Sequence, residues 1–217
     1  MIDNIIWPVK PTEFASNPFD WSWYDRDYLF TPDGIAESPN HHCKNTWLDS
    51  FPFIESKRFA VDIGCRDGEY TRYLHKDFDH VYCFDYRRRK LFNNNVDLKK
   101  ITHFKCALGE EHKVMRVSGG GSLTSQTIPE EKWYDEQLYT LDQFQLKNID
   151  YIKIDVDGYE LQVLKGSLNT IKNYHPILVI EQEFGVRSSV EFCETVLDYE
   201  VVAWDRAERN VIMKKRK

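Results

Sequence analysis

The stretch FAVDIGCRDGEYTRY, residues 59–73, decides how this chain folds. It begins with a run that is apolar except for Asp62, which is typical of a buried strand, and it ends in what is expected to be a helix. Between the two stand Gly64 and Gly68. Glycine has no Cβ and tolerates positive φ, so it allows a sharp turn and lets a ligand approach the backbone. We therefore predict a ligand-binding turn between a strand and a helix.

Beyond residue 58, predicted strands alternate with predicted helices. Such alternation favours an α/β fold with a doubly wound, mostly parallel sheet. The last two strands are joined by so short a turn that they must form an antiparallel hairpin, because a parallel crossover needs a dozen residues or more. The predicted strands are 59–63, 80–85, 102–107, 151–155, 176–181, 201–204 and 210–213, and the predicted helices are 69–76, 86–98, 161–171 and 189–197.

The first 57 residues differ from the rest in composition. They hold six of the eight prolines and four of the six tryptophans, with weak periodicity apart from a short helix predicted near 46–53. Linkers are usually polar or rich in glycine, so we interpret this part as a docked segment. The expected organisation is an aromatic-rich N-terminal segment, residues 1–57, as a candidate lid, followed by an α/β domain, residues 58–217.

Composition narrows the class of protein. The chain has 217 residues, 41% of them hydrophobic, and a net charge of −6, which argues against disorder and against general binding of nucleic acids. Its five cysteines show neither a CxxC pair nor metal-ligand spacing, which fits a reducing compartment. With neither a signal peptide nor a long apolar run visible, we expect a cytoplasmic protein without a membrane partner.

Acidic side chains gather where the predicted strands end. Ligands of open parallel sheets bind at the carboxyl ends of the strands, near the point where the strand order reverses. Four of the first five predicted strands end in carboxylates, namely Asp62, Asp85, Asp155 with Asp157, and Glu181. One acid at a strand end is unremarkable, since acids often cap helices, but four at one edge of a sheet indicate a binding site.

The spacing along the chain suggests a nucleoside. Asp85 follows Gly64 by 21 residues, the distance at which an acid ending the second strand can bind ribose hydroxyls. The dinucleotide fingerprint is incomplete, and Asp67 would repel a pyrophosphate at the helix N-terminus. A cationic cofactor suits the acids better. S-adenosylmethionine carries a sulfonium and an α-ammonium, which Asp62 or Asp155 can complement.

Three segments carry a resemblance to a known family. VDIGCRDGEYT, CFDY and TLDQFQLKNIDYIKIDVDGYELQVLKGSLNTIKNYHPILVIE closely resemble the FkbM family of S-adenosylmethionine-dependent methyltransferases, over roughly residues 58–213. The resemblance implies a class I methyltransferase fold, Rossmann-like, with the cofactor above the first three strands. It also implies O-methylation of a sugar or another small metabolite as the usual reaction.

The resemblance further implies roles for individual residues. The cofactor-binding positions would be Asp62, Gly64, Cys65 and Gly68 in the glycine loop, Asp85 and Tyr86 at the ribose, and Ala107 and Leu108 at the adenine. The acidic string of the family matches Asp155, Asp157 and Glu160. The sequence departs from the family at Arg66-Asp67, where uncharged residues are commoner, and at Asp157, where glutamate is commoner.

Methyl transfer to an alcohol needs an acceptor held in line and a base that removes its proton. Asp155 and Asp157 end a strand that should be buried, where desolvation and a like-charged neighbour can raise a pKa, and we predict them to be catalytic. In the alternative, Asp155 only orients the cofactor and Asp157 caps the next helix. Together with Glu181 they could hold Mg²⁺, although we do not expect a metal.

The expected partner is a small-molecule or carbohydrate acceptor, and the sequence does not indicate an oligomeric state. Two alternatives remain open. An NAD-dependent oxidoreductase shares the acid after the second strand, but the missing glycine and the terminal hairpin count against it. A catalytically inactive cofactor-binding protein would need Gly64, Gly68 and Asp85 but not Asp155 or Asp157, so the presence of the latter two favours an enzyme.

Overall fold

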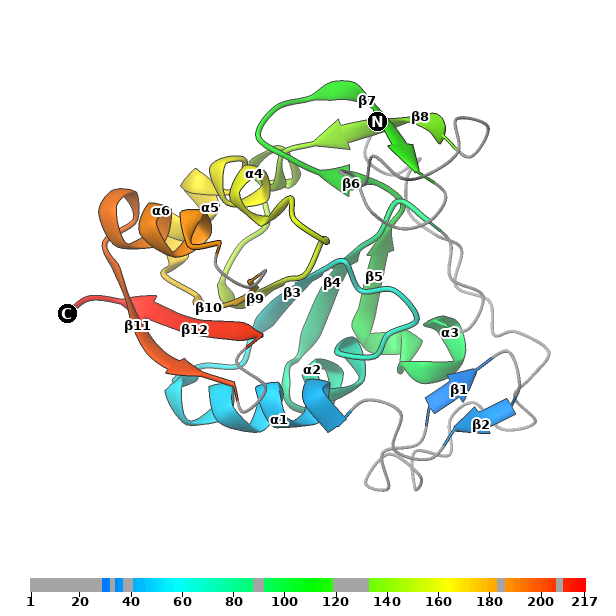
Figure 1. Ribbon diagram of the computed structural model, residues 1–217. Coiled ribbons are helices and arrows are strands. Elements are labelled where there is room, and N and C mark those ends of the chain that lie inside the picture. The colour runs from blue at the N-terminus through cyan, green and yellow to red at the C-terminus, as the bar shows by residue number, and fades with distance from the viewer. Residues whose placement is uncertain are drawn as a thin grey trace.

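The computed structural model describes residues 29–31, 34–36, 41–87, 92–118, 133–182, 186–205 and 209–217 (Figure 1). Most of the predicted N-terminal lid lies outside these residues. None of the helices within the described ranges is long and apolar enough to cross a membrane.

A seven-stranded sheet forms the centre of the described structure. Its strands are β3 (Phe59–Ile63), β4 (His80–Phe84), β5 (Ile101–Phe104), β9 (Ile149–Ile154), β10 (Ile177–Glu181), β11 (Tyr199–Trp204) and β12 (Asn210–Lys215). Across the sheet they lie in the order β11-β12-β10-β9-β3-β4-β5. The five strands from β10 to β5 run parallel, whereas β12 pairs antiparallel with both β10 and β11. The predicted mostly parallel sheet with a C-terminal antiparallel hairpin is confirmed.

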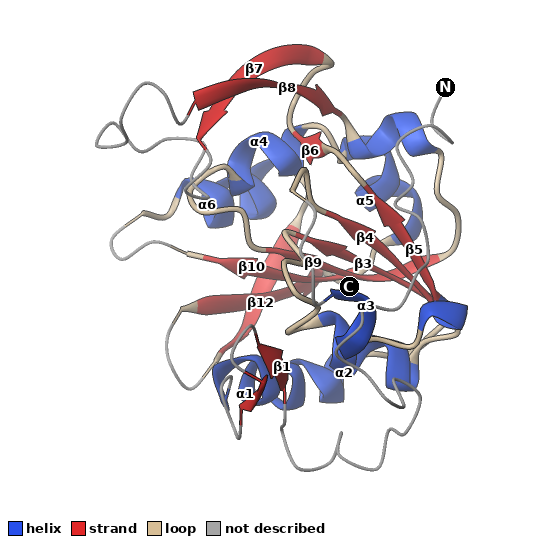
Figure 2. Ribbon diagram, turned by 90° about the vertical axis from the view of Figure 1, so that its right-hand side faces the viewer, coloured by secondary structure: helices blue, strands red, loops and turns tan. Residues whose placement is uncertain are grey.

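Helices cover both faces of this sheet (Figures 1 and 2). One face carries α1 (His41–Ser50), α2 (Thr71–Asp77) and α3 (Phe92–Asn95), and the other carries α4 (Glu160–Lys165), α5 (Leu168–Tyr174) and α6 (Ser188–Val196). Trp47 and Leu74 pack on the first face, and Leu164, Ile171 and Val190 on the second. Because both faces are buried, the central strands read as nearly continuous apolar runs.

The prediction of a third strand over 102–107 is wrong about where that strand ends. β5 stops at Phe104, and the chain turns before β6 (Ala107–Leu108), which belongs to a separate three-stranded sheet with β7 (Lys113–Ser118) and β8 (Trp133–Tyr139). The short β6 obtains its hydrogen bonds from β8, which follows it by about thirty residues, so no local pattern reveals the pairing. The departure from the main sheet directs residues 106–108 toward the carboxyl ends of the strands.

Two predicted helices also differ from the structure. In place of a helix over 86–98, the described part of this segment holds the short α3 and then a 3₁₀ turn, Leu98–Lys100. In place of one helix over 161–171 there are two, α4 and α5, with Gly166 and Ser167 between them. Leu164 and Ile171 are still buried in the same core, which is why the helical periodicity was visible.

The end of the N-terminal segment packs into the domain. Cys43 and Trp47 of α1 are buried in the core on the α2 face, and a 3₁₀ turn, Phe51–Phe53, follows. Thr46 Oγ1 donates a hydrogen bond of 2.6 Å to Asp205 Oδ2, and Ser50 Oγ lies 2.9 Å from the hydroxyl of Tyr151 in β9. Residues from Cys43 onward therefore share the core of the α/β domain. A separate lid formed by earlier residues stays a prediction.

Candidate active site

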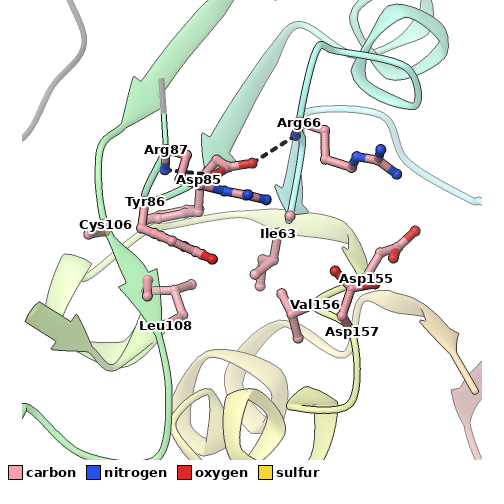
Figure 3. Close-up of a pocket in the computed structure, with 13 residues that line it drawn as sticks. Ile63, Arg66, Asp85, Tyr86, Arg87, Cys106, Leu108, Asp155, Val156 and Asp157 are labelled. Atoms are coloured by element: carbon pink, nitrogen blue, oxygen red, sulfur yellow. Dashed lines mark hydrogen bonds between the residues drawn. The ribbon is translucent and has the colours of Figure 1, made fainter. Parts of the chain in front are cut away.

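A cavity of about 280 Å³ opens at the carboxyl ends of the parallel strands (Figure 3). Its walls come from the ends of β3, β4 and β9 and from β6: Ile63, Gly64, Arg66, and the segments 84–87, 106–108 and 155–157. β3, the first strand of the sheet, lies between β4 and β9, so the strand order reverses here. This is the place at which open α/β sheets bind ligands.

Asp85 joins two loops around this cavity. Its Oδ2 accepts a 3.1 Å hydrogen bond from the backbone N–H of Arg66, and its Oδ1 accepts one of 2.8 Å from the N–H of Arg87. An ionised carboxylate offers about four acceptor positions, so the same side chain can also accept hydrogen bonds from ligand hydroxyls. Asp85 therefore presents a carboxylate to the cavity, and its binding of a ribose stays a prediction.

One end of the cavity is apolar. Cys106, Ala107 and Leu108 are buried there, and Tyr86 lies beside them (Figure 3). Behind them the ring of Phe84 stacks on a neighbouring phenylalanine of β5, with ring centroids 4.8 Å apart. A flat aromatic ring fits such an environment, because its faces need apolar contacts and its polar edge can reach backbone groups.

Gly64 is required by the close approach of β3 and β9. It has a φ of +84°, and a Cβ built on it would lie 1.8 Å from the carbonyl oxygen of Asp155. The two loops are also tied together, since Asp155 N–H donates to the carbonyl of Ile63 at 3.0 Å and Gly64 N–H to that of Phe84 at 2.9 Å. Glycine at this position therefore allows the backbones that follow β3 and β9 to contact each other at the floor of the cavity.

The other end of the cavity is acidic. Asp155 and Asp157 lie there together in Figure 3, and Glu181 at the end of β10 adds a third carboxylate. One oxygen from each of the three lies within 4.8 Å of the others. Asp157 is exposed and has a φ of +53°, whereas the other two are partly buried. The parallel strands β9 and β10 thus bring together acids that are 26 residues apart in sequence.

A buried lysine compensates this charge, and the predictions from sequence did not include it. Lys153 in β9 is 2% exposed, and its Nζ lies 3.2 Å from Asp155 Oδ2 and 3.3 Å from the carbonyl oxygen of Ile154. Its Cα pairs across the sheet with that of Asp62, which also points to the α2 face. The signal was present in the sequence, because a lysine inside an otherwise apolar strand needs a buried partner.

The pKa values of Asp155 and Glu181 are shifted in opposite directions. Burial by itself raises the pKa of Asp155, but the Lys153 ammonium, the hydrogen bond with Glu181 and the charge of Arg66 outweigh it and hold the pKa below its usual range. Burial, and then the Asp155 carboxyl, raise the pKa of Glu181 to about 8, although Arg209 lies 3.0 Å away and opposes the shift. At neutral pH the pair therefore carries one proton, mainly on Glu181.

The proton that Asp155 and Glu181 share should make the free energy of unfolding depend on pH. The pKa of Glu181 is higher in the folded state than the usual 4.5, so the folded protein binds the proton more tightly. The resulting stabilisation is fully present below about pH 4.5 and is lost as the pH rises toward 8. We expect the free energy of unfolding of the wild type to fall between pH 5 and pH 8.5 by more than that of Glu181→Gln.

Urea unfolding at several pH values measures this difference. Glu191→Gln, at an exposed position of α6, is the matched control and should follow the wild type. The buried Asp62, whose pKa is raised to about 7 chiefly by burial, contributes a slope of the same sign in every variant, so the comparison isolates Glu181. Parallel curves for the wild type and Glu181→Gln would contradict a shared proton.

Three predicted cofactor-binding residues do not line the cavity. Asp62 is buried and accepts a 2.5 Å hydrogen bond from Thr71 Oγ1 of α2. The Sγ of Cys65 is buried and lies 3.4 Å from His103 Nε2 of β5. Gly68, with a φ of +84°, donates its N–H to the carbonyl of Cys65 at 2.8 Å. These residues shape the turn from inside, whereas Gly64, Asp85, Tyr86, Ala107, Leu108, Asp155 and Asp157 face the cavity.

The three carboxylates are also the set considered for Mg²⁺. Lys153 and the shared proton already offset much of their charge. An acidic cluster is common without an ion, and we assign no metal to it.

The sheet and the position of the site define a class of protein. If the seven strands of the central sheet are numbered along the chain, their order across the sheet, starting from β5, is third, second, first, fourth, fifth, seventh, sixth. The seventh strand, β12, is antiparallel to its neighbours. With a cavity at the point where that order reverses, this is the Rossmann-like fold of class I methyltransferases. The family model of the methyltransferase FkbM domain matches residues 62–201, and the chain belongs to this family.

One solved methyltransferase agrees with the fold at a TM-score above 0.5. The methyltransferase FkbM from Methylobacillus flagellatus KT superimposes with a TM-score of 0.53 at 18% identity, over 73% of this chain and 43% of that one, so this chain spans less than half of its length. Two other structures superimpose with TM-scores below 0.5. SMU.1697c from Streptococcus mutans, solved with S-adenosylhomocysteine, has a TM-score of 0.48 at 12% identity, over 77% of this chain and 94% of that one. An rRNA methylase from Streptococcus thermophilus has a TM-score of 0.47 at 12% identity, over 82% of this chain and 97% of that one. The sequence matches no curated protein.

Proposed function

We propose that this protein transfers a methyl group from S-adenosylmethionine to a hydroxyl group of a small molecule or carbohydrate. The observation that carries the proposal is the arrangement of one cavity, in which an apolar end, the Asp85 carboxylate and the ionised Asp155 follow one another. The cofactor has the same sequence of chemical groups: a flat adenine, a ribose with two hydroxyls, and a cationic methionine end.

The groups of the cofactor can be matched to this cavity in only one direction. Adenine suits the apolar end formed by Tyr86 and residues 106–108, and the ribose then lies at Asp85. The sulfonium and the α-ammonium reach the acidic end, where Asp155 is held ionised by Lys153. A charge that is fixed before the ligand arrives attracts a cation without a cost of reorganisation.

Asp157 is the candidate general base. Lys153 binds Asp155 and lowers its pKa, which makes Asp155 a weak base and leaves it the task of orienting the cofactor. Asp157 is exposed and faces the cavity two residues further on. A hydroxyl acceptor that approaches the methyl group from this side can give its proton to Asp157 during the displacement.

Calorimetry tests the cofactor assignment. We expect the protein to bind S-adenosylhomocysteine and not NAD, in keeping with its family. Asp85→Ala should weaken binding of S-adenosylhomocysteine by about 1.5–3 kcal/mol, the scale of a hydrogen bond to a charged group. Asp79→Ala, at an exposed residue near the opposite ends of the strands, is the control and should bind as the wild type does.

Two results would contradict the assignment. Tighter binding of NAD would return the protein to the oxidoreductase alternative, and an unchanged affinity in Asp85→Ala would place the ribose elsewhere. Incubation of the protein with labelled S-adenosylmethionine and fractionated metabolites or glycans then tests the transfer itself. Label in a base-stable ether of a small molecule or carbohydrate is the expected product. Cofactor binding without transfer to any fraction would favour the inactive-protein alternative.

A further inference from the structure

Arg66 departs from the family pattern and lies in the cavity. It belongs to the loop between β3 and α2, and Figure 3 shows it at the same end of the cavity as Asp155 and Asp157, away from Cys106 and Leu108. Its backbone is left-handed, with a φ of +48°, which is uncommon for a residue other than glycine. The hydrogen bond from its N–H to Asp85 holds the loop in this conformation.

The guanidinium of Arg66 lies among negatively charged side chains. The charge of Glu69, and after it those of Asp155 and Asp157, raise the pKa of Arg66. Among the described residues, none forms a hydrogen bond or an ion pair with its side chain, whereas its backbone N–H is engaged by Asp85. The side chain is therefore an exposed cation with its donors available at the mouth of the cavity.

The methionine end of the cofactor has an anion that the acids cannot bind. Besides the sulfonium and the ammonium it carries an α-carboxylate, which would be repelled by Asp155 and needs a cationic donor. Lys153 is not suited, because it is 2% exposed and its Nζ is already held by Asp155 and the carbonyl of Ile154. Arg87 lines the cavity beside Tyr86, at the end proposed for the adenosine.

We propose that Arg66 binds the α-carboxylate of the cofactor's methionine, while Asp155 faces the ammonium. This inference rests on the proposed function, since it deepens the same site. The planar guanidinium can donate two parallel hydrogen bonds to a carboxylate, and a lysine cannot reproduce that geometry. Arg66 and Asp155 then form a charge pair that recognises an amino acid zwitterion and distinguishes the whole cofactor from a bare nucleoside.

Three ligands separate this role from a general effect on the loop. S-adenosylhomocysteine has the carboxylate, its decarboxylated analogue lacks only that group, and 5′-methylthioadenosine lacks the whole amino acid end. We expect Arg66→Met to weaken binding of S-adenosylhomocysteine about 10–100-fold in calorimetry, the scale of a charged hydrogen bond. Binding of the other two ligands should stay within about twofold of the wild type. Lys147→Met, at an exposed residue, is the matched control.

Arg66→Gly provides a second variant that relieves the left-handed backbone, so it removes the guanidinium without strain. The same selective loss is expected. Equal losses for all three ligands, or an unchanged affinity for S-adenosylhomocysteine, would overturn the assignment of the carboxylate to Arg66. If the wild type bound none of the three ligands, the cofactor proposal itself would fail, and this inference with it.

Discussion

Replacing Asp157 with asparagine should slow methyl transfer by about 10²–10⁴-fold, the usual contribution of a general base, while leaving cofactor affinity unchanged. Asparagine keeps the shape of the side chain but cannot accept the proton of the acceptor. Asp157 is exposed at the cavity, whereas the buried Lys153 pairs with Asp155. The measurement is single-turnover transfer of label to the acceptor, with calorimetry of S-adenosylhomocysteine beside it.

Asp155→Asn is the matched comparison, because it is the same substitution two residues away. It removes the carboxylate that pairs with Lys153 and that, in the proposed function, faces the cationic end of the cofactor. We expect cofactor affinity to fall, and stability also, since a buried ammonium loses its partner. Two substitutions that fail in different ways would separate binding from catalysis.

The pH profile gives an independent check on Asp157. The wild-type rate should rise with pH as the base loses its proton, and Asp157→Asn should lack this ascending limb. A metal would show itself separately, as activity lost on chelation and restored by Mg²⁺ or Mn²⁺. Wild-type turnover in Asp157→Asn, with an unchanged pH profile, would make this residue structural and leave the base to another group.

Replacing Gly64 with alanine should lower the free energy of unfolding by more than about 4 kcal/mol, in the range reached only by severe substitutions. The added Cβ would lie 1.8 Å from a backbone oxygen of Asp155, which no side-chain movement can relieve, and φ is +84°. β3 and β9 would have to separate at the floor of the cavity. We therefore expect binding of S-adenosylhomocysteine to be lost even in the fraction that folds.

Gly158→Ala is the control for the backbone conformation. Gly158 also has a positive φ, of +95°, but it is exposed. Alanine there should cost about 1–2 kcal/mol, the scale of the left-handed conformation alone. Urea unfolding measures the loss of stability in both variants, and the difference between them is the cost of the contact between the added Cβ and Asp155. Equal destabilisation of the two would mean that the contact with Asp155 relaxes easily.

Much of the sheet could be predicted because each strand carries its own evidence. β3, β9 and β10 are mostly apolar runs buried on both faces, and the antiparallel hairpin followed from the short turn before β12. The β6-β8-β7 sheet could not be predicted, since β6 is two residues long and its partner β8 is distant in sequence. The α1 helix has a weak periodicity, and its burial becomes visible only through its contact with the sheet.

Sequence alone determined which residues lie at the binding edge. Parallel strands end on the same side, so Gly64, Asp85 and Asp155 had to meet there whatever their neighbours were. Tertiary structure alone decided what surrounds each of the acids. It placed Asp62 against Thr71 and away from the cavity, and it brought Lys153 beside Asp155 and Glu181 close enough to share a proton. The direction of a side chain and the state of a proton depend on distances of a few ångströms between strands, and local sequence patterns do not encode those distances.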